Sequence, residues 1–150
     1  MKNTITISQS LIINASQEAI WNYTQDFDNR PEWDTAVMES EVIQKKPFKL
    51  VHLKMKGGLQ TDLKYKLCRR PLKTSLVMTN TKSLLFSGGG GSWVYNNEGE
   101  VVEWIQTNTL IVKHKFIYWC FGKLIKQMMH KQTKTAMMKA KLIIEQNLST

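Results

Sequence analysis

The last thirty residues limit the possible folds of this chain more than any other segment. From about Phe121 to Asn147, apolar residues fall largely on one side of a helix and lysines mostly on the rest, which predicts one amphipathic helix. At about 1.5 Å per residue, this helix is roughly 40 Å long. The side facing the rest of the protein is expected to carry Ile125, Met128, Gln132, Ala136 and Leu142. The remaining chain must therefore supply a sheet long enough to cover that side.

The N-terminal segment predicts one strand followed by two short helices. Thr4 to Ile13 is strand-like. Ser16 suits a helix N-cap, because its hydroxyl can accept a hydrogen bond from a free amide of the first turn. The helix that it caps is expected from Gln17 to about Thr24, and Pro31 can open a second short helix that reaches Asp34.

The central part of the chain is typical of antiparallel hairpins. Leu50 to Lys56 and Leu59 to Leu67 alternate between apolar and polar residues, and Gly57-Gly58 between them fits a tight turn. Further strands are expected at Val37 to Lys46, Ser75 to Thr81, Ser92 to Asn96 and Gly99 to Val112. We therefore predict an α+β protein, in which a seven-stranded antiparallel sheet wraps around a long C-terminal helix and two short helices follow the first strand.

Composition narrows the class of protein. A chain of 150 residues fits a single domain, residues 1–150. Cys68 and Cys120 lie far apart, so neither a disulfide framework nor a zinc site is expected. No apolar run is long enough to span a bilayer, and the N-terminus lacks the pattern of a secretory signal. These observations predict a cytoplasmic protein, as a monomer or a homodimer, without a cofactor.

The order of these elements resembles a known family. Ile12 to Trp21 resembles the strand-to-helix opening of the START-like, or polyketide cyclase/Bet v 1-like (SRPBCC), superfamily, and Pro31-Glu32-Trp33-Asp34 resembles its proline-x-tryptophan-acid element. Gly91 to Tyr95 with Glu103-Trp104 resembles the paired late strands, and Phe121 to Asn147 the closing helix. The resemblance covers essentially the whole chain and implies a helix-grip fold around an apolar cavity. Members bind or carry lipids, sterols and other hydrophobic molecules, and a minority are cyclases or hydrolases. The superfamily has no shared catalytic residues, so none is assigned here.

The expected partner is therefore a small hydrophobic or lipid-like molecule held in an internal cavity. Unbranched, polarizable methionines and aromatic side chains with a polar handle suit such a cavity. The candidate lining residues are Trp33, Met55, Tyr65, Met78, Trp93, Trp104, Ile125, Met128 and Gln132. For any one of these residues ordinary core packing is the simpler interpretation, but together they fit a cavity whose contents vary in shape.

An enzyme is the alternative function for the same cavity. A polyketide cyclase- or hydrolase-type reaction would use one polar group, such as Tyr65 or Glu103, to position or protonate a hydrophobic substrate. An outward orientation of Glu103 is favoured, because an isolated buried carboxylate is costly. We therefore favour a binding protein without catalysis.

Two further motifs have simple structural interpretations. Gly88 to Gly91 is followed by Ser92-Trp93, which excludes a Walker loop. The run fits a strand entry, a bulge, or a place where another backbone or a ligand approaches closely. His52, His114 and His130 have no partner at metal-ligand spacing, so no metal site is expected.

The net charge of +9 is placed unevenly. Lys54 and Lys56 point outward from one predicted strand, and Lys64 and Lys66 from its hairpin partner, where like charges would lie opposite one another. A solvated lysine-rich face is the simpler interpretation. The functional alternative is weak contact with an anionic membrane surface, in a protein whose cavity is either in use or vestigial. A nucleic-acid partner is not expected.

Overall fold

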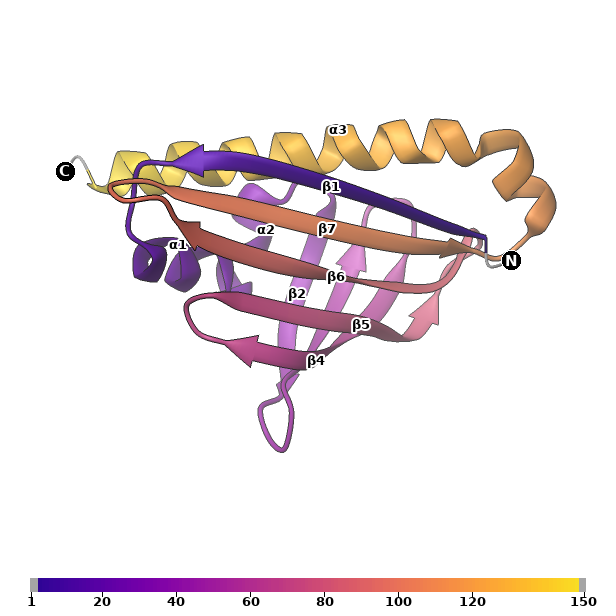
Figure 1. The fold of residues 1–150 in the computed structure, drawn as a ribbon. Helices are drawn as coiled ribbons and strands as arrows, with labels where there is room; N and C mark the ends of the chain where they lie inside the picture. The colour runs from indigo at the N-terminus through magenta and orange to yellow at the C-terminus, as the bar shows by residue number, and fades with distance from the viewer. Residues whose placement is uncertain (1–2, 149–150) are drawn as a thin grey trace.

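The described part of the chain forms one sheet of seven strands, all paired in antiparallel fashion. The computed structural model describes residues 3–148, so the first two and last two residues of the predicted domain lie outside it. The strands lie in the order β1-β7-β6-β5-β4-β3-β2 (Figure 1). Their bounds are β1 Thr4–Ile13, β2 Val37–Gln44, β3 Leu50–Met55, β4 Gln60–Arg69, β5 Lys73–Lys82, β6 Phe86–Asn97 and β7 Val102–Val112. The predicted α+β class and helix-grip architecture are confirmed.

The helices lie at the two ends of the sequence, as predicted. They are α1 Gln17–Thr24, the 3-10 turn η1 Phe27–Asn29, α2 Arg30–Trp33 and α3 Lys115–Leu148. The Ser16 hydroxyl accepts the predicted capping hydrogen bond from the Ala19 amide at 3.1 Å. The expected start of the last helix at Phe121 is wrong: α3 begins at Lys115. Its first turns are held because the Tyr118 amide donates to the His114 carbonyl, and Ile117 and Tyr118 pack on buried residues.

Helix α3 runs beside the edge strand β1 (Figure 1). The Lys141 ammonium donates to the Ile12 carbonyl at 2.8 Å, and the Asn14 amide donates to the Glu145 carboxylate at 2.8 Å. The buried side of the helix carries Ile125, Met129, Ala136, Met137, Ala140 and Ile144. The expectation that Met128 and Leu142 face the sheet is wrong, because the contact with β1 places them on the flank of α3, 46% and 64% exposed.

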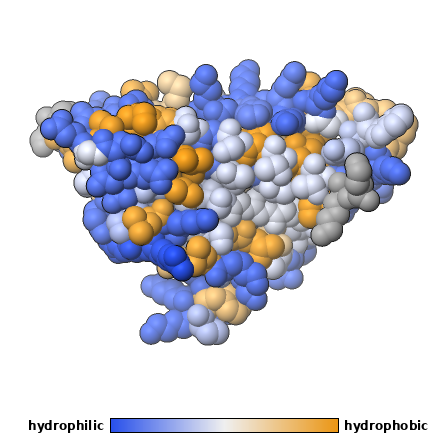
Figure 2. Space-filling view, viewed as in Figure 1, coloured by the Kyte–Doolittle hydropathy of each residue, from blue (hydrophilic) through white to orange (hydrophobic). Residues whose placement is uncertain are grey.

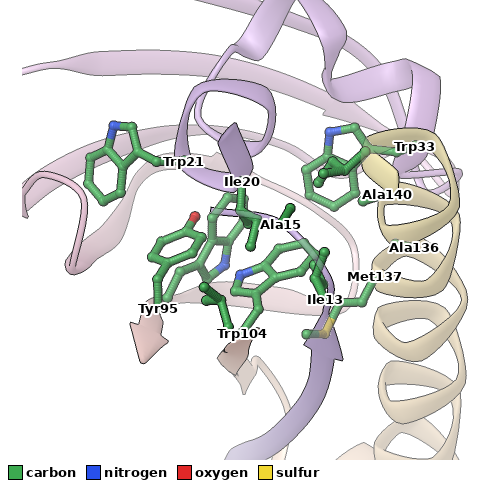
Figure 3. Close-up of a cluster of buried hydrophobic side chains, with 13 residues drawn as sticks. Ile13, Ala15, Ile20, Trp21, Trp33, Tyr95, Trp104, Ala136, Met137 and Ala140 are labelled. Atoms are coloured by element: carbon green, nitrogen blue, oxygen red, sulfur yellow. The ribbon is translucent and has the colours of Figure 1, made fainter. Parts of the chain in front are cut away.

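The fully buried side chains of the described residues fall into three clusters, and partly buried Met55 and Met78 connect the second to the third. The tryptophan cluster joins α1, α2, the ends of β1, β6 and β7, and the C-terminal half of α3; Trp33 and Trp104 are fully buried in it (Figure 3). A second cluster joins β1 and β7 to the first half of α3 through Ile7, Ile125 and Met129. The third lies over β2, β3 and β4. The space between the three clusters is where a cavity can form.

The four consecutive glycines lie inside β6 and allow its neighbours to come close. A Cβ atom on Gly90 would lie 2.6 Å from the Leu76 carbonyl oxygen in β5, and one on Gly91 would lie 2.8 Å from the Thr107 carbonyl oxygen in β7. A register shift marks a bulge at the start of this run. The prediction of a bulge and of a close backbone approach is confirmed, and it permits the tight curvature of the sheet.

Candidate functional site

A cavity of about 150 Å³ lies between α3 and the sheet, among residues of all three clusters. Its apolar wall is made by side chains of β3, β4, β5 and α3, chiefly Leu53, Met55, Leu63, Met78 and Met129. Gly90 contributes bare backbone at β6. Three of these five side chains are methionines, whose unbranched chains adapt readily, so the wall is both apolar and deformable.

One end of the cavity is polar and contains a buried ion pair. The Arg30 guanidinium donates to the Asp34 carboxylate through Nε at 2.9 Å and Nη2 at 2.8 Å. The guanidinium carbon lies 4.7 Å from the ring centroids of both Trp33 and Trp93, within cation–π distance. Both charged side chains are about nine-tenths buried and line the cavity. The Nη1 atom of Arg30 is buried and has no hydrogen-bond partner among the described residues.

A second buried donor lines the same cavity. Gln106, on β7, is only 3% exposed. Its Oε1 accepts a hydrogen bond from Asn108 at 3.3 Å, and Asn108 also donates to the Thr133 hydroxyl of α3 at 3.1 Å. The Nε2 amide of Gln106 has no partner among residues 3–148. An unpaired buried donor costs free energy, about 1–3 kcal/mol, so these two donors mark a place that suits a hydrogen-bond acceptor.

A separate buried network holds the tyrosines. The Tyr65 hydroxyl donates to Gln25 Oε1 at 2.7 Å, and the Gln25 amide donates to the Tyr95 hydroxyl at 3.0 Å. Burial raises the pKa of both tyrosines well above its ordinary value, so both stay protonated. Tyr65 is committed to this network and does not line the cavity. Glu103 lies between buried Val102 and Trp104 in the sequence, and its carboxylate accepts a hydrogen bond from Asn96 at 3.4 Å. It does not line the cavity, which agrees with the outward orientation predicted for it.

The nine candidate residues fall into three groups. Four line the cavity: Met55, Met78, Trp93 and Gln132. Four are buried in the surrounding clusters: Trp33, Tyr65, Trp104 and Ile125. Met128 is on the exposed flank of α3, away from the cavity.

Sequence reasoning missed the polar end of the cavity. Arg30 and Asp34 are four residues apart, with Trp33 between them in the sequence, and this is the spacing of an ion pair on a helix. Gln106 is in phase with inward-facing Val102 and Trp104 on β7. The alternation that identified β7 as a strand therefore also carried the signal that Gln106 points inward.

The expectation that like charges lie opposite one another on the two lysine-rich strands is wrong. Register places Gln60 opposite Lys54 and Leu50 opposite Lys64. Lys54 pairs with Glu39 of β2 at 3.0 Å, and His52 Nδ1 lies 2.7 Å from the Asp62 carboxylate. Acidic partners therefore interrupt this face. Within the described chain, no three His, Cys, Asp or Glu side chains come together to hold a metal, and no helix is long and apolar enough to cross a bilayer.

Comparisons with known proteins agree with this architecture. The family model described as polyketide cyclase/dehydrase and lipid transport matches residues 4–133. A START superfamily protein from Mycobacterium smegmatis superposes with a TM-score of 0.79 at 13% identity, covering 94% of this chain and 97% of that one. An aromatase/cyclase from a Streptomyces species gives a TM-score of 0.82 at 8% identity, covering 97% and 96%. A Thermus thermophilus protein gives 0.80 at 14% identity, covering 93% and 96%. These likenesses show the fold. The search of curated proteins gives no match.

Proposed function

The chain belongs to the polyketide cyclase/dehydrase and lipid transport family, and from that premise we propose that it binds a small, mainly apolar ligand in the cavity between α3 and the sheet. The observation that carries the proposal is the cavity itself: an apolar wall with two unpaired buried donors, Arg30 Nη1 and Gln106 Nε2. Ligand sites typically combine an apolar lining with a few polar groups that fix orientation.

The polar end favours a neutral acceptor over an anion. Asp34 already balances the charge of Arg30, so a ligand carboxylate would bury a net negative charge beside the Asp34 carboxylate. A ketone, ester or amide carbonyl offers lone pairs to both donors without that cost. The favoured ligand is therefore an apolar carbonyl compound with its oxygen toward Arg30 and Gln106.

The volume sets the size of a ligand that enters without rearrangement. A cavity of about 150 Å³ matches one aromatic ring with a small substituent. Larger ligands require Met55, Met78, Met129 or Gln132 to change rotamer, which unbranched side chains do at low cost.

A pair of shape-matched probes tests the proposal. Acetophenone and α-methylstyrene have nearly the same shape, but only acetophenone has a carbonyl oxygen. Both should bind and raise the melting temperature. Acetophenone should bind about tenfold more tightly, because one satisfied buried donor contributes about 1–2 kcal/mol. Isothermal titration calorimetry and thermal unfolding measure both effects.

Two variants make the test specific to the cavity. Gln106→Met keeps the side-chain length but removes the unpaired amide, so it should narrow the difference between the probes and raise the melting temperature of the free protein. Ala136→Trp should fill the cavity and prevent binding of both probes with the fold retained by circular dichroism. Failure of either probe to bind the wild-type protein would contradict the proposal.

A further inference from the structure

Large apolar side chains are exposed at the start of α3 and in the loop before β6. Leu84 is 91% exposed, Trp119 83% and Phe116 74%, and Leu85 is also exposed. The Lys113 amide donates to the Leu85 carbonyl at 2.8 Å, so this loop lies directly beside the first turn of α3. We call Leu84, Leu85, Phe116 and Trp119 the α3-start patch. Orange side chains appear among blue ones at this end of the molecule in Figure 2.

Neither the cavity nor the buried core accounts for the apolar side chains of the α3-start patch. None of its four residues lines the cavity, and none belongs to the three buried clusters. A single exposed leucine is ordinary, but neighbouring exposed Leu, Phe and Trp side chains mark an interaction surface. Phe116 and Trp119 are three residues apart on a helix, so they share one side of it.

The charge around the patch has one sign. Lysines 82, 113, 115, 123 and 126 flank it in sequence, and no Asp or Glu occurs between Glu103 and Glu145. A groove beside the patch, between β1 and α3, is lined by Trp119, Lys123 and Lys126 together with Thr4 and Thr6. The α3-start patch is therefore an apolar surface in a positively charged setting.

These two properties together select the partner. A second copy of this chain would place lysines against lysines. Duplex nucleic acid would balance the charge but offers no apolar layer for Leu84 and Phe116. An anionic bilayer supplies both, because Trp and Phe side chains insert at the interface while Lys side chains attract anionic headgroups. We propose that the α3-start patch docks the protein on an anionic lipid bilayer.

This surface differs from the Lys54 and Lys64 strand face. That face carries Glu39 and Asp62 as partners of its basic groups, whereas the α3-start patch has no acid nearby in sequence. Docking also does not depend on the ligand proposed above, because the patch lies outside the cavity.

Vesicle binding tests the proposal directly. Wild-type protein should co-sediment with vesicles of phosphatidylglycerol and phosphatidylcholine, and much less with phosphatidylcholine alone. The Phe116→Ser/Trp119→Ser variant should bind anionic vesicles at least about tenfold more weakly. The matched control Met138→Ser/Leu142→Ser removes two exposed apolar side chains elsewhere on α3 and should bind like wild type.

Charge and specificity are tested in the same assay. Lys113→Gln/Lys115→Gln should weaken binding and its salt dependence, whereas Lys54→Gln/Lys56→Gln should not. Equal vesicle binding by the wild type and by the Phe116→Ser/Trp119→Ser variant would overturn the proposal, as would no binding by either. Self-association of the wild type that this double variant abolishes, without lipid binding, would instead identify a dimer interface. An unchanged circular dichroism spectrum and melting temperature of the double variant show that it remains folded.

Discussion

The Tyr95 hydroxyl sits in the middle of a buried hydrogen-bond chain whose proton positions follow from simple counting. The Thr24 hydroxyl has one proton and donates it to the Ile20 carbonyl at 2.8 Å. The 2.7 Å contact between Thr24 and Tyr95 must therefore be a hydrogen bond that Tyr95 donates. Tyr95 in turn accepts from Gln25, and Gln25 accepts from Tyr65. All four bonds point the same way, an arrangement in which each bond strengthens the next.

The central place of Tyr95 in this chain predicts unequal effects of two similar substitutions. Tyr65→Phe removes the first donor and leaves one carbonyl oxygen of Gln25 unpaired, at a cost of about 1–2 kcal/mol. Tyr95→Phe removes an acceptor and a donor together, so it should cost more, about 2–4 kcal/mol. Urea unfolding of both variants measures the free energies of unfolding. A larger loss for Tyr65→Phe would contradict the central place of Tyr95 in this chain.

The Asp62 carboxylate predicts a pH effect on stability. Burial opposes its charge, but hydrogen bonds from Asn80 at 2.9 Å and His52 at 2.7 Å outweigh burial and hold the pKa of Asp62 below its ordinary value of 3.8. A carboxyl group with a depressed pKa stabilises the fold above its ordinary value, and that stability is lost as the pH falls through the lower folded value.

Asp62→Asn should therefore flatten the fall in unfolding free energy below about pH 4. His52→Leu removes one of the two hydrogen bonds and should give an intermediate slope. Denaturant unfolding at several pH values from 2 to about 6 measures the slopes. Identical slopes for the wild type and for Asp62→Asn would show that this carboxylate does not contribute.

Two glycines of β6, Gly90 and Gly88, allow a test of how closely the neighbouring strand backbones approach this strand, with Gly88 as the control. A Cβ on Gly90 would lie 2.6 Å from a backbone oxygen, so Gly90→Ala should lower the free energy of unfolding by about 1–3 kcal/mol. A Cβ on Gly88 meets nothing within 4 Å, and its φ is ordinary. Gly88→Ala should therefore be neutral or stabilising by up to about 1 kcal/mol. Thermal unfolding measures the stability of both variants. Equal losses of stability would show that the close approach of the neighbouring backbone does not require glycine at position 90.

Elements with a clean local pattern could be predicted from the sequence, and elements that depend on contacts elsewhere could not. β1 and α1 match their predicted ranges because alternation and a Ser16 cap are local signals. The start of α3 was missed because the aromatic and β-branched residues before Phe121 have low helix propensity and become helical by packing on the second cluster. Strand β6 begins at Phe86 and not at Ser92 as expected, because the glycines between them carry no side-chain pattern that sets a boundary.

The cavity itself was predictable only in part, for a similar reason. Period-two alternation placed Met55 and Met78 on the inward face, and both line the cavity. Whether an inward residue meets a cluster or the gap between clusters depends on how far the sheet curls, which no local pattern encodes. Trp104 and Ile125 are therefore buried in clusters, although they have the same inward periodicity as the residues that line the gap.

At the scale of the whole molecule, a net charge of +9 predicts a response to salt. Few ion pairs oppose the mutual repulsion, and the Arg70–Glu18 and Lys54–Glu39 pairs are exposed and contribute little. Raising sodium chloride from about 10 mM to about 150 mM should screen the repulsion and raise the melting temperature by a few degrees. A decrease would mean that the ion pairs dominate.

The division of the core into three clusters has a consequence for how such a chain can change over generations. Residues such as Met55 and Met78 are only partly buried and line the cavity, so exchanging them would reshape the cavity while the tryptophan cluster keeps its packing. A scaffold of this kind can diverge far without losing its shape, in keeping with the 8% and 14% identity to proteins that superpose with TM-scores of 0.82 and 0.80.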